Sequence, residues 1–324
     1  MCTCMTFKTK DHYFGRNLDL EYRFNEKVVI TPRNYPFSLK SGKEFHTKYA
    51  FIGAATVIDE YPLYAEATNE KGLSIASLQF PENAYYNTME SDKINITPYE
   101  FIPWVLGNFS SVEELGNELV NVNITNIPFN KEIPVSPLHF MVSDDKYCIV
   151  VEPMKGGVQI YFNNIGILTN NPPFSFHLTN INNYLNLTPD LTKNRFSPKI
   201  KLETYSLGMG AIGLPGDNSS ASRFIRSAFN RLNSVCDSDE ESSISQFFHI
   251  LDNVTVIRGT TMTKDKKWNI TTYSCCMNTT KGIYYYKTYH NSQITCVKMN
   301  EENKNSKSLT TYNLEEHQQI RYEN

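Results

Sequence analysis

Short runs of β-branched and aromatic residues dominate the hydrophobic pattern of the chain, and polar residues, glycine or proline separate them. Runs of this kind predict β-strands. They gather in three blocks, within the first eighty residues, between 139 and 170, and from 268 to 299. We expect strands at 12–19, 27–32, 49–56, 73–80, 139–144, 148–153, 157–163, 165–170, 268–277, 282–289 and 293–299, with turns at 155–157 and 281–282.

Helical segments lie between these strand blocks. Residues 97–100 combine a capping threonine, a proline at the first helical position and a glutamate, which predicts a helix up to about residue 107. A second capping box predicts a helix over 111–119, and apolar residues recur at helical spacing over 220–232 and 245–251. Strand blocks and helices in this order favour stacked layers over alternating βαβ units.

Composition and charge exclude several classes of protein. With 324 residues, 40% hydrophobic and 13% aromatic, the chain has enough apolar material for a sizeable core. A net charge of −3 gives no electrostatic case for nucleic acid. No apolar run is long enough to span a membrane. The first residues do not resemble a secretory signal, so we expect a cytoplasmic protein of one domain over 1–324.

The cysteine and histidine patterns predict neither a disulfide framework nor a metal site. The seven cysteines are odd in number and irregularly spaced, which in a reducing compartment indicates free thiols. There is no CxxC pair, and the seven histidines lack ligand spacing. We therefore expect no metal and no cofactor.

Cys2 directly follows the initiator methionine. Removal of Met1, which occurs before small residues, would place a thiol and a free α-amine on one residue. Such an amine has an ordinary pKa of about 7.7–8.0 and can act as the general base for its own thiol. Position alone favours an ordinary cysteine near a frayed terminus, and both interpretations stay open at this point.

Two charged residues strengthen the catalytic interpretation. If 2–8 pairs with 12–19 as a hairpin, Arg16 and Asp19 return close to Cys2. A guanidinium beside a sulfur favours the thiolate, and a carboxylate can orient the amine. An ordinary surface pair of Arg16 and Asp19 is the alternative.

Two further residues could complete such a site. Asn170 follows an apolar strand, and its amide could donate to a developing oxyanion, which is worth about 3 kcal/mol when preorganised. Arg223 lies near the start of a predicted helix and could reach the same place. Asn170 also fits a simple turn, and Arg223 also fits a solvated helix position.

The motifs around these residues resemble the choloylglycine hydrolase family, which includes bile salt hydrolases and penicillin V acylases. They extend over nearly the whole chain as MCT, YFGRNLDLEY, VVITPRNY, ATNEKGLSIA, ILTNNPPF, YSLGMGAIGLPGDNSSASRFIR, SQFFHIL and GIYYYKTY. The resemblance implies an α+β fold, the αββα four-layer sandwich of N-terminal-nucleophile hydrolases. It also implies assembly as a homotetramer.

The resemblance also assigns roles to individual residues. Cys2 would be the nucleophile, and its freed amine would be the base. Arg16 would lie against the sulfur, and Asp19 would hold the amine and thiol in place. Asn170 would donate to the oxyanion, and Arg223 would complete the polar network.

Gln79 departs from the family pattern. Bile salt hydrolases usually carry asparagine at this position, and penicillin V acylases tend to carry tyrosine. The family's second oxyanion contact here is largely a backbone N–H, so glutamine is compatible with activity. Its extra methylene leaves the rate and the substrate preference open.

The substrate implied by the resemblance is a conjugated bile salt, whose rigid apolar steroid needs an apolar pocket. The candidate walls are the connection after 15–19, the loop around 61–64 and the segment 127–138. Plain core packing is an equally good explanation for each of the pocket candidates. They are Leu18, Phe24, Phe129, Ile133 and Leu138.

The leading hypothesis is hydrolysis of glycine- and taurine-conjugated bile salts through a thioester on Cys2. Penicillin V acylase or N-acyl-homoserine-lactone acylase activity with the same residues is the alternative among enzymes. A catalytically weak relative that only binds bile acids is the alternative from another class, and five intact candidate residues argue against it.

Overall fold

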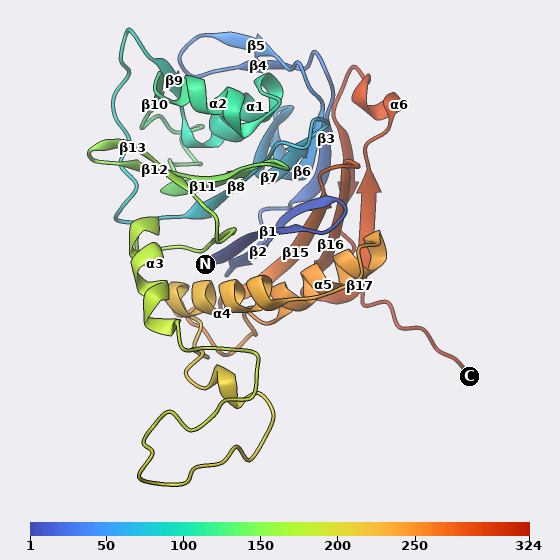
Figure 1. Cartoon of the computed structure of the whole chain (residues 1–324). Helices are drawn as coiled ribbons and strands as arrows, with labels where there is room; N and C mark the ends of the chain where they lie inside the picture. The colour runs from blue at the N-terminus through green and yellow to red at the C-terminus, as the bar shows by residue number, and fades with distance from the viewer.

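Two large β-sheets form the centre of the computed structural model, which describes residues 1–324 (Figure 1). The first sheet is antiparallel and has the order β14 (Ile167–Leu168), β1 (Cys2–Lys8), β2 (His12–Leu20), β15 (Ile270–Asn278), β16 (Ile283–Thr288) and β17 (Asn291–Lys298). The second has the order β13 (Gly157–Phe162), β12 (Cys148–Met154), β11 (Leu138–Ser143), β8 (Ser74–Gln79), β7 (Tyr61–Asn69), β6 (Phe51–Ile58), β3 (Lys27–Thr31) and β18 (Thr310–Asn313).

Helices cover the outer face of each sheet (Figure 1). The helices α1 (Pro98–Asn108) and α2 (Val112–Leu119) pack on the second sheet, in a core cluster with Phe101, Leu115 and Phe140. The helices α4 (Ser220–Asn233) and α5 (Glu240–Asp252) pack on the first sheet, through Phe224 and Phe247. The order of layers is therefore α, β, β, α, as expected.

Smaller elements complete the chain. They are the hairpin β4 (Pro36–Ser38) and β5 (Glu44–His46), the parallel pair β9 (Ile94–Ile96) and β10 (Val122–Ile124), the helices α3 (Phe174–Asn180) and α6 (Glu301–Lys304), and the 3₁₀ turns Ile181–Tyr184 and Met209–Ala211. Between α3 and α4 the chain makes a long excursion away from the sheets (Figure 1). No helix has both the length and the apolar character needed to cross a bilayer.

The predicted strands are all present, with ends that shift by a few residues. The predicted turn at 155–157 joins β12 to β13, and Gly157 has the positive φ of +103° that favours glycine. The segment 61–64 was expected to be a loop and is instead the start of β7. Pro62 lies near the start of this strand, where proline is tolerated.

Two helices also differ from the prediction. The helix expected from 245 begins at Glu240, because Asp239 caps it by accepting the N–H of Ser242 at 2.9 Å. The helix α3 was not expected, since only Phe174 and His177 of its seven residues are buried.

Candidate active site

A hairpin positions Cys2 at the edge of a deep cavity. The strands β1 and β2 pair with Cys2 opposite Leu18 and Cys4 opposite Arg16, which confirms the predicted hairpin. The Cys2 side chain is buried, yet it lines a cavity whose walls come from strands of both sheets. Most of the lining residues are hydrophobic, 13 of 21. An apolar acyl group would therefore be well accommodated next to the thiol.

Asn170 connects three segments at the thiol end of this cavity. Its Oδ1 accepts the backbone N–H of Cys2 at 2.7 Å, and its Nδ2 donates to the Gln79 carbonyl at 2.8 Å. The Asn170 N–H donates to Ser220 Oγ at the start of α4, at 2.8 Å. The Nδ2 group has a second hydrogen with no hydrogen-bond partner, and Asn170 is buried beside the cavity without being one of its lining residues.

Arg223 lies behind Cys2 and does not line the cavity. Its Nη1 donates to the Cys2 carbonyl and to Thr3 Oγ1, and its Nη2 donates to Asn170 Oδ1 at 2.8 Å. Its Nε donates to the Asn218 carbonyl at 3.0 Å. Burial lowers the pKa of Arg223, against the opposing effect of Asp19. The guanidinium therefore ties the backbone of β1 to Asn170 and α4.

Arg16 lines the cavity from between the two sheets. Its Nη1 donates to the carbonyls of Ser77 and Ala65, and lies 3.7 Å from Glu66 Oε2. Although burial acts to lower it, Cys2 and Glu66 raise the pKa of Arg16 above its ordinary value. The residue therefore keeps a positive charge at the thiol end of the cavity.

Glu66 is a buried carboxyl group that the sequence analysis did not single out. The hydroxyls of Tyr273 and Tyr284 donate to it at 2.9 Å and 2.7 Å. Burial raises the pKa of Glu66, and Arg16 with the two tyrosine hydroxyls opposes that rise. The cluster links the second sheet to the first directly beneath Arg16.

Asp19 lies next to the first residue of the chain. Its N–H donates to the Met1 carbonyl at 3.0 Å, and the Met1 amine donates to its carbonyl at 2.8 Å. Its Oδ1 accepts from Thr271 Oγ1 at 2.6 Å, and its buried Oδ2 has no hydrogen-bond partner. Asp19 does not line the cavity, and both of its hydrogen bonds to the N-terminal end of the chain are with Met1.

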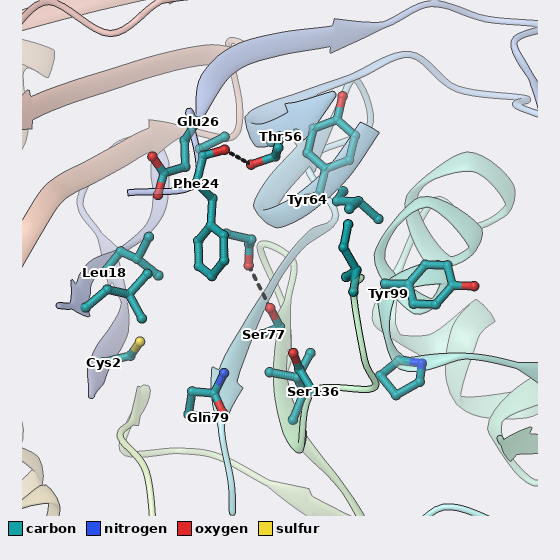
Figure 2. A pocket seen from close by; sticks show the side chains of 18 of the residues that line it. Cys2, Leu18, Phe24, Glu26, Thr56, Tyr64, Ser77, Gln79, Tyr99 and Ser136 are labelled. Atoms are coloured by element: carbon teal, nitrogen blue, oxygen red, sulfur yellow. Dashed lines mark hydrogen bonds between the residues drawn. The ribbon is translucent and has the colours of Figure 1, made fainter. Parts of the chain in front are cut away.

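Four of the five predicted pocket residues line the cavity, together with Gln79. The exception is Phe129, whose ring packs behind the cavity against Tyr99 and Tyr61, with ring centroids 5.2 Å and 5.5 Å away. Figure 2 shows Cys2 and Gln79 at one end of the cavity and Phe24, Thr56 and Tyr64 at the other. The lining residues that lie where we expected them are Leu18, Phe24, Ile133 and Leu138.

Several lining residues escaped the sequence analysis. Ser77, two residues before Gln79 on β8, is one of them. Tyr64 lies in the segment 61–64 that we expected to line the pocket, although it belongs to β7 and not to a loop. Tyr99 lies within the capping motif 97–100 that predicted α1, in the first turn of that helix, and it lines the cavity. The capping motif was therefore the one available signal for Tyr99.

Comparisons with known proteins agree with this geometry. The chain is similar to the bile salt hydrolase/transferase of Lactiplantibacillus plantarum, with 48% identity over 314 residues and 97% of each chain covered. It superimposes on the mutant C2A conjugated bile acid hydrolase from Clostridium perfringens with a TM-score of 0.94, at 42% identity and 100% coverage of each chain. The penicillin V acylase from Agrobacterium tumefaciens shares the fold, with a TM-score of 0.75 at 19% identity, over 96% of this chain and 91% of that one.

The αββα sandwich with a cysteine at position 2 is that of the N-terminal-nucleophile hydrolases. The family model described as linear amide C–N hydrolases, choloylglycine hydrolase family, matches residues 2–312. The chain belongs to this family, which confirms the resemblance read from its motifs.

Proposed function

We propose that this enzyme hydrolyses the amide bond of glycine- and taurine-conjugated bile salts, with Cys2 as the nucleophile. The observation that carries the proposal is the thiol at one end of a cavity whose lining is mostly hydrophobic. A conjugated bile salt has matching chemistry, since its amide joins a rigid apolar steroid to a charged amino acid. The names of the relatives, bile salt hydrolase/transferase and conjugated bile acid hydrolase, support the same substrate.

The reaction requires removal of Met1, which frees the amine of Cys2. That nitrogen already donates to Asn170 Oδ1 at 2.7 Å, so the free amine would be held in orientation. The amine takes the thiol proton, and the sulfur attacks the amide carbon. The C–N bond then breaks, the amine passes its proton to the departing glycine or taurine, and a thioester remains. Water, deprotonated by the same amine, attacks the thioester carbon. The C–S bond then breaks, the amine returns the proton to the departing sulfur, and the free bile acid leaves.

The surrounding residues would act on the negative charge and on the geometry of this reaction. The second hydrogen on Asn170 Nδ2 would stabilise the oxyanion of each tetrahedral intermediate. Arg16 would favour the thiolate through its charge. Arg223 would hold the Cys2 carbonyl and Asn170 in register. Removal of Met1 would also remove both backbone hydrogen bonds between Asp19 and Met1, and the unpartnered carboxylate oxygen of Asp19 would then orient the freed amine and the thiol.

Gln79 would have two roles in the proposed reaction. Its carbonyl accepts from Asn170 Nδ2 and thereby sets the orientation of that amide. Its side chain lines the cavity and would contact the substrate near the scissile bond. Penicillin V acylase activity with the same catalytic set is the second candidate, and the unusual glutamine is the observation that favours testing it.

We further propose a cytoplasmic homotetramer in which 1–324 is one domain. The excursion between α3 and α4 supports self-association, because it exposes large apolar side chains to solvent. Seven unpaired cysteines support a reducing compartment. Light scattering would test the tetramer. The exposed apolar residues are Leu185, Phe196, Tyr205 and Leu207, each more than four-fifths exposed.

The first test is amino-acid release from glycocholate, taurocholate and penicillin V by purified protein whose mass confirms removal of Met1. We expect cleavage of the bile salts by the wild type and none by Cys2→Ala. Cys4→Ala is the matched control, because it deletes the same thiol two residues along the strand, and it should stay active. Cleavage of penicillin V alone would overturn the substrate, and bile-acid binding without turnover would overturn the enzyme.

A further inference from the structure

Two buried histidines lie behind Asn170, and neither lines the cavity. His139 on β11 contacts the Thr169 carbonyl through Nε2 at 2.9 Å, and its Nδ1 lies 3.0 Å from Glu152 Oε1 on β12. His177 on α3 contacts the Asn170 carbonyl through Nε2 at 3.2 Å. Two successive carbonyls of the segment that carries the candidate oxyanion donor are therefore each held by a buried ring.

His139 also contacts the segment that carries Gln79. Its ring stacks on Phe80, with centroids 4.2 Å apart and planes 8° from parallel, and Phe80 follows Gln79 directly. The Gln79 carbonyl in turn accepts from Asn170 Nδ2. His139 therefore contacts both the segment of Asn170 and the segment of Gln79, which are joined by the hydrogen bond from Asn170 Nδ2 to the Gln79 carbonyl.

Each ring nitrogen of His139 faces an oxygen, so its two contacts need two hydrogens. A neutral ring beside a carboxylate has only one. The Thr169 carbonyl only accepts, so Nε2 must carry a hydrogen. Glu152 Oε1, which also accepts the N–H of Phe174 at 2.9 Å, needs another hydrogen between itself and Nδ1. The pair is therefore an imidazolium beside a carboxylate or a neutral ring beside a carboxylic acid, and both forms have zero net charge.

We propose that His139, oriented by Glu152, is a positioning residue for the hydrolysis. It fixes the Thr169 carbonyl and the Phe80 ring, and through them the Asn170 amide that faces the oxyanion. The inference rests on the proposed function, because it presupposes that Asn170 stabilises an oxyanion. A misplacement of about 1 Å in such a group lowers the rate on the order of 100-fold.

Glu152→Gln is the most informative substitution. It keeps the shape of the carboxyl group but changes the number of hydrogens available for the contacts with His139 and Phe174. If the amide oxygen faces Phe174, His139 must be charged without a counter-ion or lose the hydrogen that reaches Thr169. If the amide nitrogen faces Phe174, two donors oppose each other. We expect kcat on glycocholate to fall on the order of 10- to 100-fold with KM nearly unchanged, and His139→Leu to lose at least as much.

Alkylation of Cys2 by iodoacetamide distinguishes a positioning role from a general loss of structure. Alkylation forms no oxyanion, so Glu152→Gln should react as fast as the wild type. His12→Gln is the matched control, because His12 is also buried and hydrogen-bonded, to Thr279 and Ser143, but lies at the far end of β2. We expect its kcat and its alkylation rate to match those of the wild type.

Reduced kcat with unchanged alkylation in Glu152→Gln would support the inference, even if His139→Leu does not fold. Wild-type kcat in Glu152→Gln, or equal losses of kcat and alkylation, would overturn it and leave the proposed function intact. A wild type that cleaves no conjugated bile salt would overturn the proposed function, and this inference with it.

Discussion

Replacing Asn170 with aspartate separates its donor function from its other contacts. Oδ1 accepts from the Cys2 N–H and from Arg223 Nη2, and an aspartate oxygen would accept both. Nδ2 donates one hydrogen to the Gln79 carbonyl and retains a second. Asn170→Asp removes these two hydrogens and keeps the shape of the side chain.

Each lost hydrogen has its own expected cost. Loss of a preorganised oxyanion donor lowers kcat about 10²- to 10³-fold, or about 2.7–4 kcal/mol. Loss of the other hydrogen leaves two buried oxygens opposed at the 2.8 Å that separates Nδ2 from the Gln79 carbonyl, which costs roughly 1–3 kcal/mol of stability. The stronger, charge-assisted bond to Arg223 offsets part of that loss. We therefore expect a folded enzyme with a much lower kcat and a similar KM.

The assay is the steady-state rate of glycine release from glycocholate, with urea unfolding measured in parallel. Asn171→Asp is the matched control, because Asn171 donates to the Pro81 carbonyl outside the cavity and its replacement should leave kcat unchanged. An Asn170→Asp enzyme that keeps more than about a tenth of the wild-type kcat would refute the oxyanion role.

Three other outcomes are expected. Arg223→Lys should lower kcat more than Arg226→Lys one turn further along α4, because a lysine cannot reach the Cys2 carbonyl, Thr3 and Asn170 together; equal losses in the two kinetic assays would contradict this. An N-terminal extension that prevents removal of Met1 should abolish turnover without lowering the urea midpoint, and an active extended protein would exclude the amine as base. Burial lowers the pKa of His12 and of His177 from 6.5 to about 4, so the folded state resists protonation. This stabilisation is complete above pH 6.5 and is lost as the pH falls from 6.5 to 4, by roughly 3 kcal/mol for each ring. Urea unfolding against pH should show that loss, and His12→Gln or His177→Gln should flatten the curve.

Local patterns in the sequence were sufficient for much of the fold. The hairpin of β1 and β2 involves neighbouring residues, and its register brought Arg16 and Asp19 back to the N-terminus as expected. The hydrophobic pattern could not predict which aromatic residues of a loop face the cavity. A residue that lines a cavity and one that packs behind it are equally apolar in the sequence. Phe129 was accordingly grouped with the pocket, although Tyr99 lies between them.

Long-range contacts of polar groups were mostly beyond the sequence. The convergence of Asn170 and Arg223 on Cys2 depends on α4 packing across the first sheet, which no local pattern specifies. His139 and Glu152 are an instructive intermediate case. The antiparallel register of β11 and β12 pairs Phe140 with Val151. His139 and Glu152 therefore lie opposite each other at the next position. A predicted hairpin register would therefore have found the pair, whereas its contact with Thr169 required the fold.

The two ends of the cavity are built from different kinds of structure. The thiol end rests on strands and on buried partners, so its hydrogen bonds cannot be exchanged for bonds to water and its geometry exists before a substrate arrives. The far end is formed partly by connecting segments, where Phe24 is 48% exposed and Ile133 is only partly buried. Loops tolerate substitution far better than buried strands. A substitution at the far end should therefore change which acyl group fits without disturbing the hydrogen bonds at the thiol end.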